Sequence, residues 1–345
     1  MVLRSSNVKN GEIVDADNVY INPEIASADN VQEGDIIVVV RNGSRALIGK
    51  HAQIKDPKPN TVIGAFMSGM RSEHSSFVNA LLDTSAFENE IAKNMGATIN
   101  QITGYMFSKM EFVIPTDDEQ EKIGEYFANL DHLITLHQRE CEQAKKYKKY
   151  MLQKMFPQNG SNVPEIRFSG FTYAWEQRKL GDVFKEYSEK NHIELPALTI
   201  IQGGGTVKRE DSDRNLMYDE SNLSNYKMVR KDDFIVHLRS FEGGLEKSSL
   251  DGIISPAYHT FHSDVADSRF YYPYFRSHEF IKYKLVPHVY GIRDGRSIDI
   301  DGMKTIEIPY TSLEEQRRIG DYLESLDHLI TLHQQKPIQQ KYKND

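Results

Sequence analysis

The sequence predicts an α/β protein in which two globular domains are separated by two long helices that pair as an antiparallel coiled coil. Its 345 residues exceed what a single hydrophobic core usually fills, so two domains are expected. A long-period internal repeat and a heptad spacing of apolar residues predict the helices. The expected boundaries are 1–115 and 158–307 for the domains, and 116–157 and 308–345 for the helices.

The internal repeat is the most specific of these observations. Residues 119–138 and 315–334 lie 196 positions apart and agree at fourteen of twenty positions, and the nine residues Leu130–Gln138 recur unchanged as Leu326–Gln334. Upstream, IIVVVR at 36–41 and FIVHLR at 234–239 share only a β-strand pattern. We interpret the constant segment as a common helical scaffold and the variable segments as domains with different targets.

Both repeated segments carry the same signals for a helix start. The Ser/Thr-x-x-Glu spacing of a capping box predicts that each side chain satisfies a backbone N–H of the first turn. The residues are Thr116 with Glu119, and Ser312 with Glu315. Gly124 and Gly320 also occupy matching positions, which suggests that another backbone approaches the helix closely there.

A heptad seam runs along the first helix and calls for a partner helix. Its members are Ile123, Phe127, Leu130, Ile134, His137, Cys141, Ala144, Lys148, Met151 and Met155, and the second copy repeats it with Ile319, Leu323, Leu326, Ile330 and His333. We expect the two helices to pair antiparallel, although a hairpin with a purely stabilising role is the alternative for such a seam. At about 1.5 Å per residue, the first helix would span roughly 57 Å.

Pro337 breaks the resemblance between the two helices. Proline removes one helical hydrogen bond and clashes with the preceding turn, so the distal helix is expected to kink or end near Gln335.

Composition narrows the class of protein. One cysteine and no long apolar run predict a cytoplasmic protein without a membrane segment. The net charge of −8 weighs against binding nucleic acid through total charge, unless basic residues cluster locally or partner subunits supply positive surface.

Enzymatic motifs are not evident, so a non-catalytic protein without a cofactor or metal of its own is expected. His132 and His137 are five residues apart, whereas two zinc ligands on one helix face are usually four apart. QGGGTVK at 202–208 does not match a phosphate-binding loop, and the aspartates at 232–233 and 299–301 fit turns.

The order of domain, central helix with P-x-x-x-EQ-x-x-I and LDHLITLHQ, second domain and distal helix copy resembles type I restriction-modification specificity subunits. WEQRKLGDVF at 175–184 and IISPAYHTF at 253–261 add to the resemblance, which covers nearly the whole chain. Relative to that pattern, the counterpart of residues 164–198 would lie before Met1, so the first target-recognition domain is expected to be N-terminally shortened.

The resemblance implies a DNA-binding subunit in which each domain reads one half of a bipartite site on double-stranded DNA. It also implies that the helices dock two modification (methyltransferase) subunits, which restriction subunits join. S-adenosylmethionine, ATP and Mg would then belong to those partners. The alternative is a coiled-coil adaptor that recruits protein partners without reading DNA. The net negative charge of the chain is compatible with this alternative.

Candidate DNA-reading residues are Arg, Lys, Asn, Gln, Ser and Tyr in segments expected to be loops or strand ends, because Arg pairs well with guanine and Asn or Gln with adenine. In the first domain they are Arg41, Asn42, Ser44, Arg45, Asn100 and Gln101. In the second they are Lys208, Arg209, Arg239, Ser240, Tyr290, Arg293 and Arg296. The stretch 276–296, with Arg276, Lys282 and Lys284, is expected to form a basic patch, with an ordinary solvated surface as the alternative.

Overall fold

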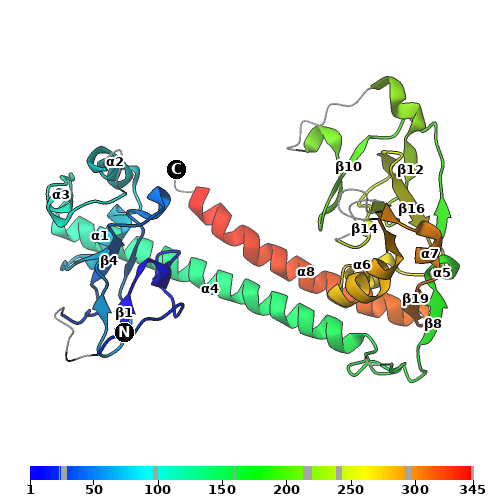
Figure 1. Ribbon diagram of the computed structural model, residues 1–345, viewed down its shortest axis with the longest axis horizontal. Helices are drawn as coiled ribbons and strands as arrows, with labels where there is room; N and C mark the ends of the chain where they lie inside the picture. The colour runs from blue at the N-terminus through cyan, green and yellow to red at the C-terminus, as the bar shows by residue number, and fades with distance from the viewer. Residues whose placement is uncertain are drawn as a thin grey trace. The chain divides into compact units, whose positions relative to one another are not determined.

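The computed structural model describes residues 1–22, 24, 29–95, 100–158, 160–212, 220–237, 243–291 and 297–342. The chain forms two compact units, in agreement with the two domains expected. Unit 1 comprises residues 1–137 and 339–345, and unit 2 comprises residues 138–338, so the first long helix contributes to both. Both units combine helices with small sheets, as Figure 1 shows.

Unit 1 is built around one short, fully buried strand. Its elements are β1 (Val2–Leu3), β2 (Val8–Lys9), β3 (Glu12–Ile13), β4 (Ile36–Val39), β5 (His51–Gln53), β6 (Val62–Ile63), β7 (Met67–Met70), α1 (Ser75–Leu81), α2 (Ser85–Asn94) and α3 (Gly104–Ser108). β4 lies between β5 and β7, antiparallel to both. Ile37 and Val39 enter one apolar cluster, and Ile36 and Val38 enter another with Phe87 of α2. The run IIVV is uniformly apolar because both faces of this strand are covered.

Unit 2 repeats this arrangement around β13 (Phe234–His237). Its other strands are β8 (Glu176–Lys179), β9 (Lys185–Tyr187), β10 (Leu198–Ile201), β11 (Gly205–Lys208), β12 (Lys227–Val229), β14 (Glu246–Lys247), β15 (Gly252–Ile254), β16 (Tyr258–His262), β17 (Val289–Tyr290), β18 (Ser297–Ile298) and β19 (Glu307–Tyr310). Its short helices include α5 (Leu180–Val183), α6 (Ser268–Phe275) and α7 (Ile300–Lys304). β13 lies between β14 and β16, antiparallel to both, within the sheet β14-β13-β16-β9.

The turn before each central strand is also duplicated. Asp35 accepts a hydrogen bond from the Gln32 N–H at 2.8 Å, and Asp233 accepts one from the Arg230 N–H at 3.0 Å. Both carboxylates are buried, and each has a basic partner at the end of the neighbouring strand: Arg71, which follows β7, for Asp35, and His262, the last residue of β16, for Asp233. The repeat therefore extends into the domains as a conserved geometry with little sequence identity.

The two long helices lie where the repeat predicts them. α4 is Asp117–Met155 and α8 is Leu313–Tyr342. Within unit 2 the second half of α4 pairs antiparallel with α8, because the Cys141 thiol meets the Ile330 carbonyl at 3.9 Å while the Tyr322 hydroxyl donates to that of Tyr147 at 2.9 Å. No helix in the described part of the chain is both long and apolar enough to cross a membrane.

Two expectations about these helices are wrong in detail. α8 does not end near Gln335 but continues through Pro337 to Tyr342, and the kink expected there as the other outcome stays a prediction. Proline fixes φ near −65°, a helical value, so a long helix can accommodate the loss of one hydrogen bond. The capping boxes are also incomplete: the Ser312 Oγ accepts from the Glu315 N–H, but the Glu315 carboxylate binds other side chains, and Glu119 only accepts from the Thr116 hydroxyl.

Candidate nucleic-acid interface

The end of β4 brings together the residues singled out in the first domain. Arg41 forms an isolated antiparallel bridge with Gln101, and the Asn42 N–H donates to the Asn100 carbonyl at 3.2 Å. The Asn100 Nδ2 in turn donates to the Gly43 carbonyl at 3.0 Å. Segments 41–45 and 100–101, about sixty residues apart in sequence, therefore form one surface.

The side chains on this surface differ in how firmly they are held. Asn42 is fixed, because its Nδ2 donates to the Ser5 Oγ at 3.1 Å and its Oδ1 accepts from the Ser44 N–H at 3.0 Å. Ser44 and Arg45 are exposed. The exposed Arg41 guanidinium lies 4.9 Å from the ring centre of Phe66, an exposed aromatic residue that the sequence reasoning missed.

The equivalent strand end in unit 2 borders a cavity. Arg239 and Ser240, which follow β13, lie outside the described residues, as do Arg293 and Arg296. A cavity of about 490 Å³ adjoins this strand end and is lined by Gln202, His237 and Tyr258, among others. None of these three was singled out from the sequence, and only the repeat position of β13 could have indicated them.

The remaining candidates of unit 2 have different surroundings. Lys208 is exposed and lies 3.6 Å from Glu210, whereas Arg209 is half-buried and donates to the Tyr226 hydroxyl at 3.3 Å. Tyr290 is exposed on β17, which pairs antiparallel with β18.

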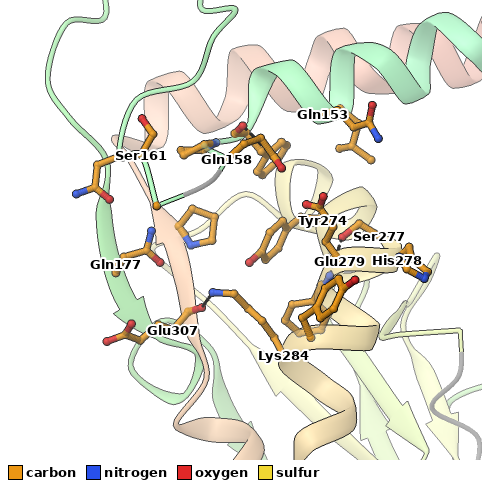
Figure 2. Close-up of a pocket in the computed structure, with 18 of the residues that line it drawn as sticks. Gln153, Gln158, Ser161, Gln177, Tyr274, Ser277, His278, Glu279, Lys284 and Glu307 are labelled. Atoms are coloured by element: carbon orange, nitrogen blue, oxygen red, sulfur yellow. Dashed lines mark hydrogen bonds between the residues drawn. The ribbon is translucent and has the colours of Figure 1, made fainter.

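Of the basic patch expected at 276–296, Arg276 and Lys284 are engaged within unit 2 and Lys282 is exposed, whereas Arg293 and Arg296 lie outside the described residues. Arg276 is ion-paired with the buried Glu246. Lys284 is half-buried and donates to the Glu307 carbonyl at 2.5 Å, and burial lowers the pKa of its amine. Figure 2 shows Lys284 beside a cavity of about 800 Å³ that is also lined by Gln177 and Tyr274. Closeness in sequence did not predict a shared surface for Arg276 and Lys284, because neighbouring side chains of a helical segment point in different directions.

A buried carboxylate anchors the start of α8 within unit 2. Glu315 is 1% exposed and accepts two hydrogen bonds from Arg167, at 2.6 and 2.8 Å, and one from the Trp175 indole N–H at 3.1 Å. The hydroxyl of Thr311 also donates to it. The residues that precede β8 are thereby tied to the helix.

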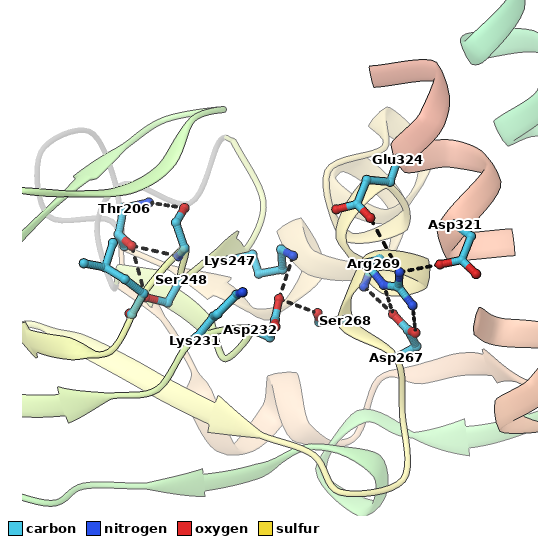
Figure 3. A network of polar contacts seen from close by, with 12 residues as sticks. Thr206, Lys231, Asp232, Lys247, Ser248, Asp267, Ser268, Arg269, Asp321 and Glu324 are labelled. Carbon is cyan, nitrogen blue, oxygen red and sulfur yellow. Dashed lines mark hydrogen bonds and ion pairs between the residues drawn. The ribbon is translucent and has the colours of Figure 1, made fainter. Parts of the chain in front are cut away.

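Ion pairs also connect α8 to α6. Figure 3 shows Arg269 of α6 facing Asp321 and Glu324 of α8 and also contacting Asp267, while Lys247 and Ser268 meet at Asp232.

The matched glycines make close approach possible in both units. A Cβ at Gly320 would lie 3.1 Å from the Arg269 Cβ, and a Cβ at Gly124 would lie 2.7 Å from the Phe77 backbone nitrogen of α1. The close backbone approach expected at these positions is confirmed.

Comparison with known proteins agrees with this duplicated architecture. The specificity subunit of the type I restriction enzyme MjaVIII from Methanocaldococcus jannaschii is 24% identical over 267 residues, which cover 72% of this chain and 62% of that protein. The chain therefore spans less than two thirds of the length of this relative. The type I restriction-modification S subunit from M. genitalium has a similar fold, with a TM-score of 0.58 at 14% identity, over 91% of this chain and 81% of that one.

The family comparison covers most of the chain. The profile of the type I restriction modification DNA specificity domain matches residues 2–146 and 173–341, which include most of both units, the larger part of α4 and nearly all of α8. The chain therefore belongs to the type I restriction modification DNA specificity domain family.

Proposed function

We propose that this chain is the sequence-specific DNA-binding subunit of a type I restriction-modification system, and that it directs methyltransferase and restriction subunits to a bipartite site. Each unit reads one half of the site. The observation that carries this proposal is the strand-end surface of unit 1, where Arg41 and Arg45 lie on the same surface as Asn100 and Gln101. These are the side-chain types that fit guanine and adenine edges in the major groove.

The proposal assigns chemistry to the partners and positioning to this chain. S-adenosylmethionine, ATP and Mg belong to the partner subunits, and the complex works in the cytoplasm. The local surface at β4 accounts for DNA binding by a chain with a net charge of −8, since partners can supply further positive surface.

The helices supply a duplicated docking surface in this proposal. Leu133 and Leu136 are exposed in unit 1, and their repeat counterparts Leu329 and Leu332 are exposed in unit 2. Exposed apolar residues at matching positions suit an interface that is used twice. Two copies of one modification subunit would occupy them.

The test is an electrophoretic mobility shift with the modification subunits present. We expect sequence-specific retention of DNA that weakens steeply with salt. Arg41→Ala and Arg45→Ala should each reduce discrimination between cognate and non-cognate DNA by about 1–3 kcal/mol if the side chain contacts a base. Lys93→Ala, which removes an exposed lysine paired with Glu90 on α2, is the matched control and should change little.

The adaptor alternative makes the opposite prediction. An adaptor would hold the partner subunits together without any salt-sensitive preference for one DNA sequence. Retention that is equal on all sequences, or unchanged in the Arg41 and Arg45 variants together, would contradict the assignment of the strand-end surface.

A further inference from the structure

Glu246 is a buried carboxylate of β14 that the equivalent strand of unit 1 lacks. It lies opposite Ile235 of β13, whereas Ala52 lies opposite Ile37 of β4. Ile37 and Ile235 occupy equivalent places, 198 residues apart, so this strand pairing can form with a buried alanine at the position of Glu246. Burying a charge costs free energy unless its partners compensate for the loss of water. The partners of Glu246 therefore indicate its role.

These partners come from two separate segments of unit 2. The Glu246 Oε1 accepts hydrogen bonds from the Gly203 N–H at 2.7 Å and from Arg276, and the Oε2 accepts from the Tyr272 hydroxyl at 2.9 Å. Gly203 lies in the hairpin loop 202–204, which joins β10 to β11. Tyr272 and Arg276 belong to α6 and its C-terminal cap. Glu246 thus ties the hairpin loop to α6.

Glycines allow this loop and its neighbours to approach one another closely. Gly203 and Gly205 have positive φ angles of 81° and 72°. A Cβ at Gly203 would lie 3.0 Å from the Arg276 Nη2, and a Cβ at Gly243 would lie 2.5 Å from the Gln202 Nε2. The glycine run that matched no phosphate-binding loop therefore forms a tight turn, with the Gln202 side chain packed against Gly243.

Gln202 is the first residue of the hairpin loop and borders the strand-end cavity of unit 2. It is exposed and lines the cavity of about 490 Å³ next to the end of β13. Among the described residues, none forms a hydrogen bond with its side chain. A glutamine amide offers a donor and an acceptor side by side, which match N6 and N7 of adenine. Its backbone is held in place while its amide stays available.

Unit 1 holds a corresponding loop at its own strand end. β1 ends at Leu3 and β10 ends at Ile201, again 198 residues apart. Ser5, the counterpart of Gly203, accepts a hydrogen bond from the Asn42 Nδ2 at 3.1 Å, and Asn42 belongs to the strand-end surface of β4. The loop has the same place in both units, but its sequence and its anchor differ. That combination suits an element that reads different bases in the two units.

We propose that the hairpin loop 202–204 determines specificity in unit 2, with Gln202 contacting an adenine and Glu246 acting as the positioning residue. Glu246 holds the N–H of Gly203, and Gly243 leaves room for the Gln202 side chain. The inference rests on the proposed function, because it requires that unit 2 reads one half of a DNA site.

The test is selection of DNA from a randomised library by this chain assembled with its modification subunits, followed by sequencing of the bound DNA. The wild-type complex should select a motif in two parts. Gln202→Ala should lower the preference for an A·T pair at one position by about 5- to 150-fold, which is the range for one lost bidentate base contact. Arg41→Ala should act on the other part. Gln177→Ala, which removes an exposed glutamine of β8, is the matched control and should change neither part.

Further substitutions test the positioning without removing Gln202. Gly243→Ala should lower the same preference, and combining it with Gln202→Ala should cost no more than Gln202→Ala alone, since both act through one side chain. Glu246→Ala should also lower this preference. Glu246→Gln should retain more of it, because the amide oxygen can still accept the N–H of Gly203. A merely structural role would lower the melting temperature and leave base preference unchanged.

The outcomes separate this inference from the proposed function. A wild-type complex that selects no sequence would overturn both. A motif in two parts that responds to Arg41→Ala but not to Gln202→Ala would overturn this inference alone. Base preference that is unchanged in Gly243→Ala and in Glu246→Gln would overturn the positioning role. Gly243→Ala decides the matter even where Glu246→Ala does not fold, because Gly243 does not have a positive φ.

Discussion

At the scale of single residues, Glu315 illustrates how one carboxylate fixes a helix to a domain. Glu315→Ala would leave the Arg167 guanidinium, 11% exposed, without its partner in a buried position. Removing one member of a buried ion pair costs about 3–5 kcal/mol, so the free energy of unfolding of unit 2 should fall by about that amount. Urea denaturation followed by tryptophan fluorescence measures it.

The repeat supplies a matched control for this substitution. Glu119→Ala removes the counterpart carboxylate, which is exposed, and exposed polar contacts contribute about 1 kcal/mol or less. Equal losses of unfolding free energy for the two variants would show that the buried contacts of Glu315 do not stabilise the attachment of α8 to unit 2.

The duplicated aspartates predict a dependence of stability on pH. The hydrogen bond from Arg71 lowers the pKa of Asp35 below its ordinary value of 3.8. Its stabilisation is present above 3.8 and is lost as the pH falls through the lower pKa of the folded state. Arg71→Gln should therefore flatten the acid dependence of β4 amide exchange, and an unchanged profile would contradict the assignment.

His262, the basic partner in the second copy, titrates in the opposite sense. Burial disfavours its charged form, but hydrogen bonds to Asp233 and Asp264 outweigh burial, and its pKa is raised above 6.5. That stabilisation is complete below 6.5 and is lost as the pH rises through the raised pKa. The two equivalent pairs therefore respond to different pH ranges.

The sequence named residues that the structure places together at one strand end, but it did not show which basic side chains are already paired within the domain. Arg41 and Gln101 meet because a strand end and a later segment form a bridge. Arg276 instead faces the buried Glu246, and Arg209 packs against Tyr226. Charge alone does not indicate which arginines are already paired.

At the scale of elements, the matched glycines Gly124 and Gly320 predict stability losses of different size when each is replaced by alanine. Gly124→Ala places a Cβ 2.7 Å from the Phe77 backbone nitrogen, whereas at Gly320 the nearest atoms are the Arg269 Cβ at 3.1 Å and the Phe270 backbone nitrogen at 3.2 Å. The strain of overpacking, about 1–3 kcal/mol, exceeds the gain of about 1 kcal/mol in helix propensity only at the tighter site. Thermal denaturation followed by circular dichroism should show a larger loss for Gly124→Ala than for Gly320→Ala.

The opposite ranking would mean that α1 and α4 separate more readily than α6 and α8. It would contradict the view that Gly124 is required for close backbone contact.

The sequence predicted the long helices well and their partners incompletely. Repeat, heptad spacing and helix-start residues place α4 and α8 correctly, because these signals are local. The seam is buried at Cys141, Met151 and Met155 but open at Ile123 and Phe127. A heptad pattern shows which face is suited to burial, and it does not show whether a partner is present along its whole length.

At the scale of the whole molecule, the duplication predicted two units and the equivalence of β4 and β13, because an offset can be read even where identity is low. It could not predict that α4 is shared between the two compact units, which depends on the summed contacts of both.

Trp175 has a practical consequence for studying this molecule. It is the only tryptophan of the chain, and it is buried in unit 2 against Phe156 and Phe270. Its emission is therefore a local optical reporter of one unit, while circular dichroism averages over both. Comparing the two signals during a single melt distinguishes one cooperative transition from two without any added label.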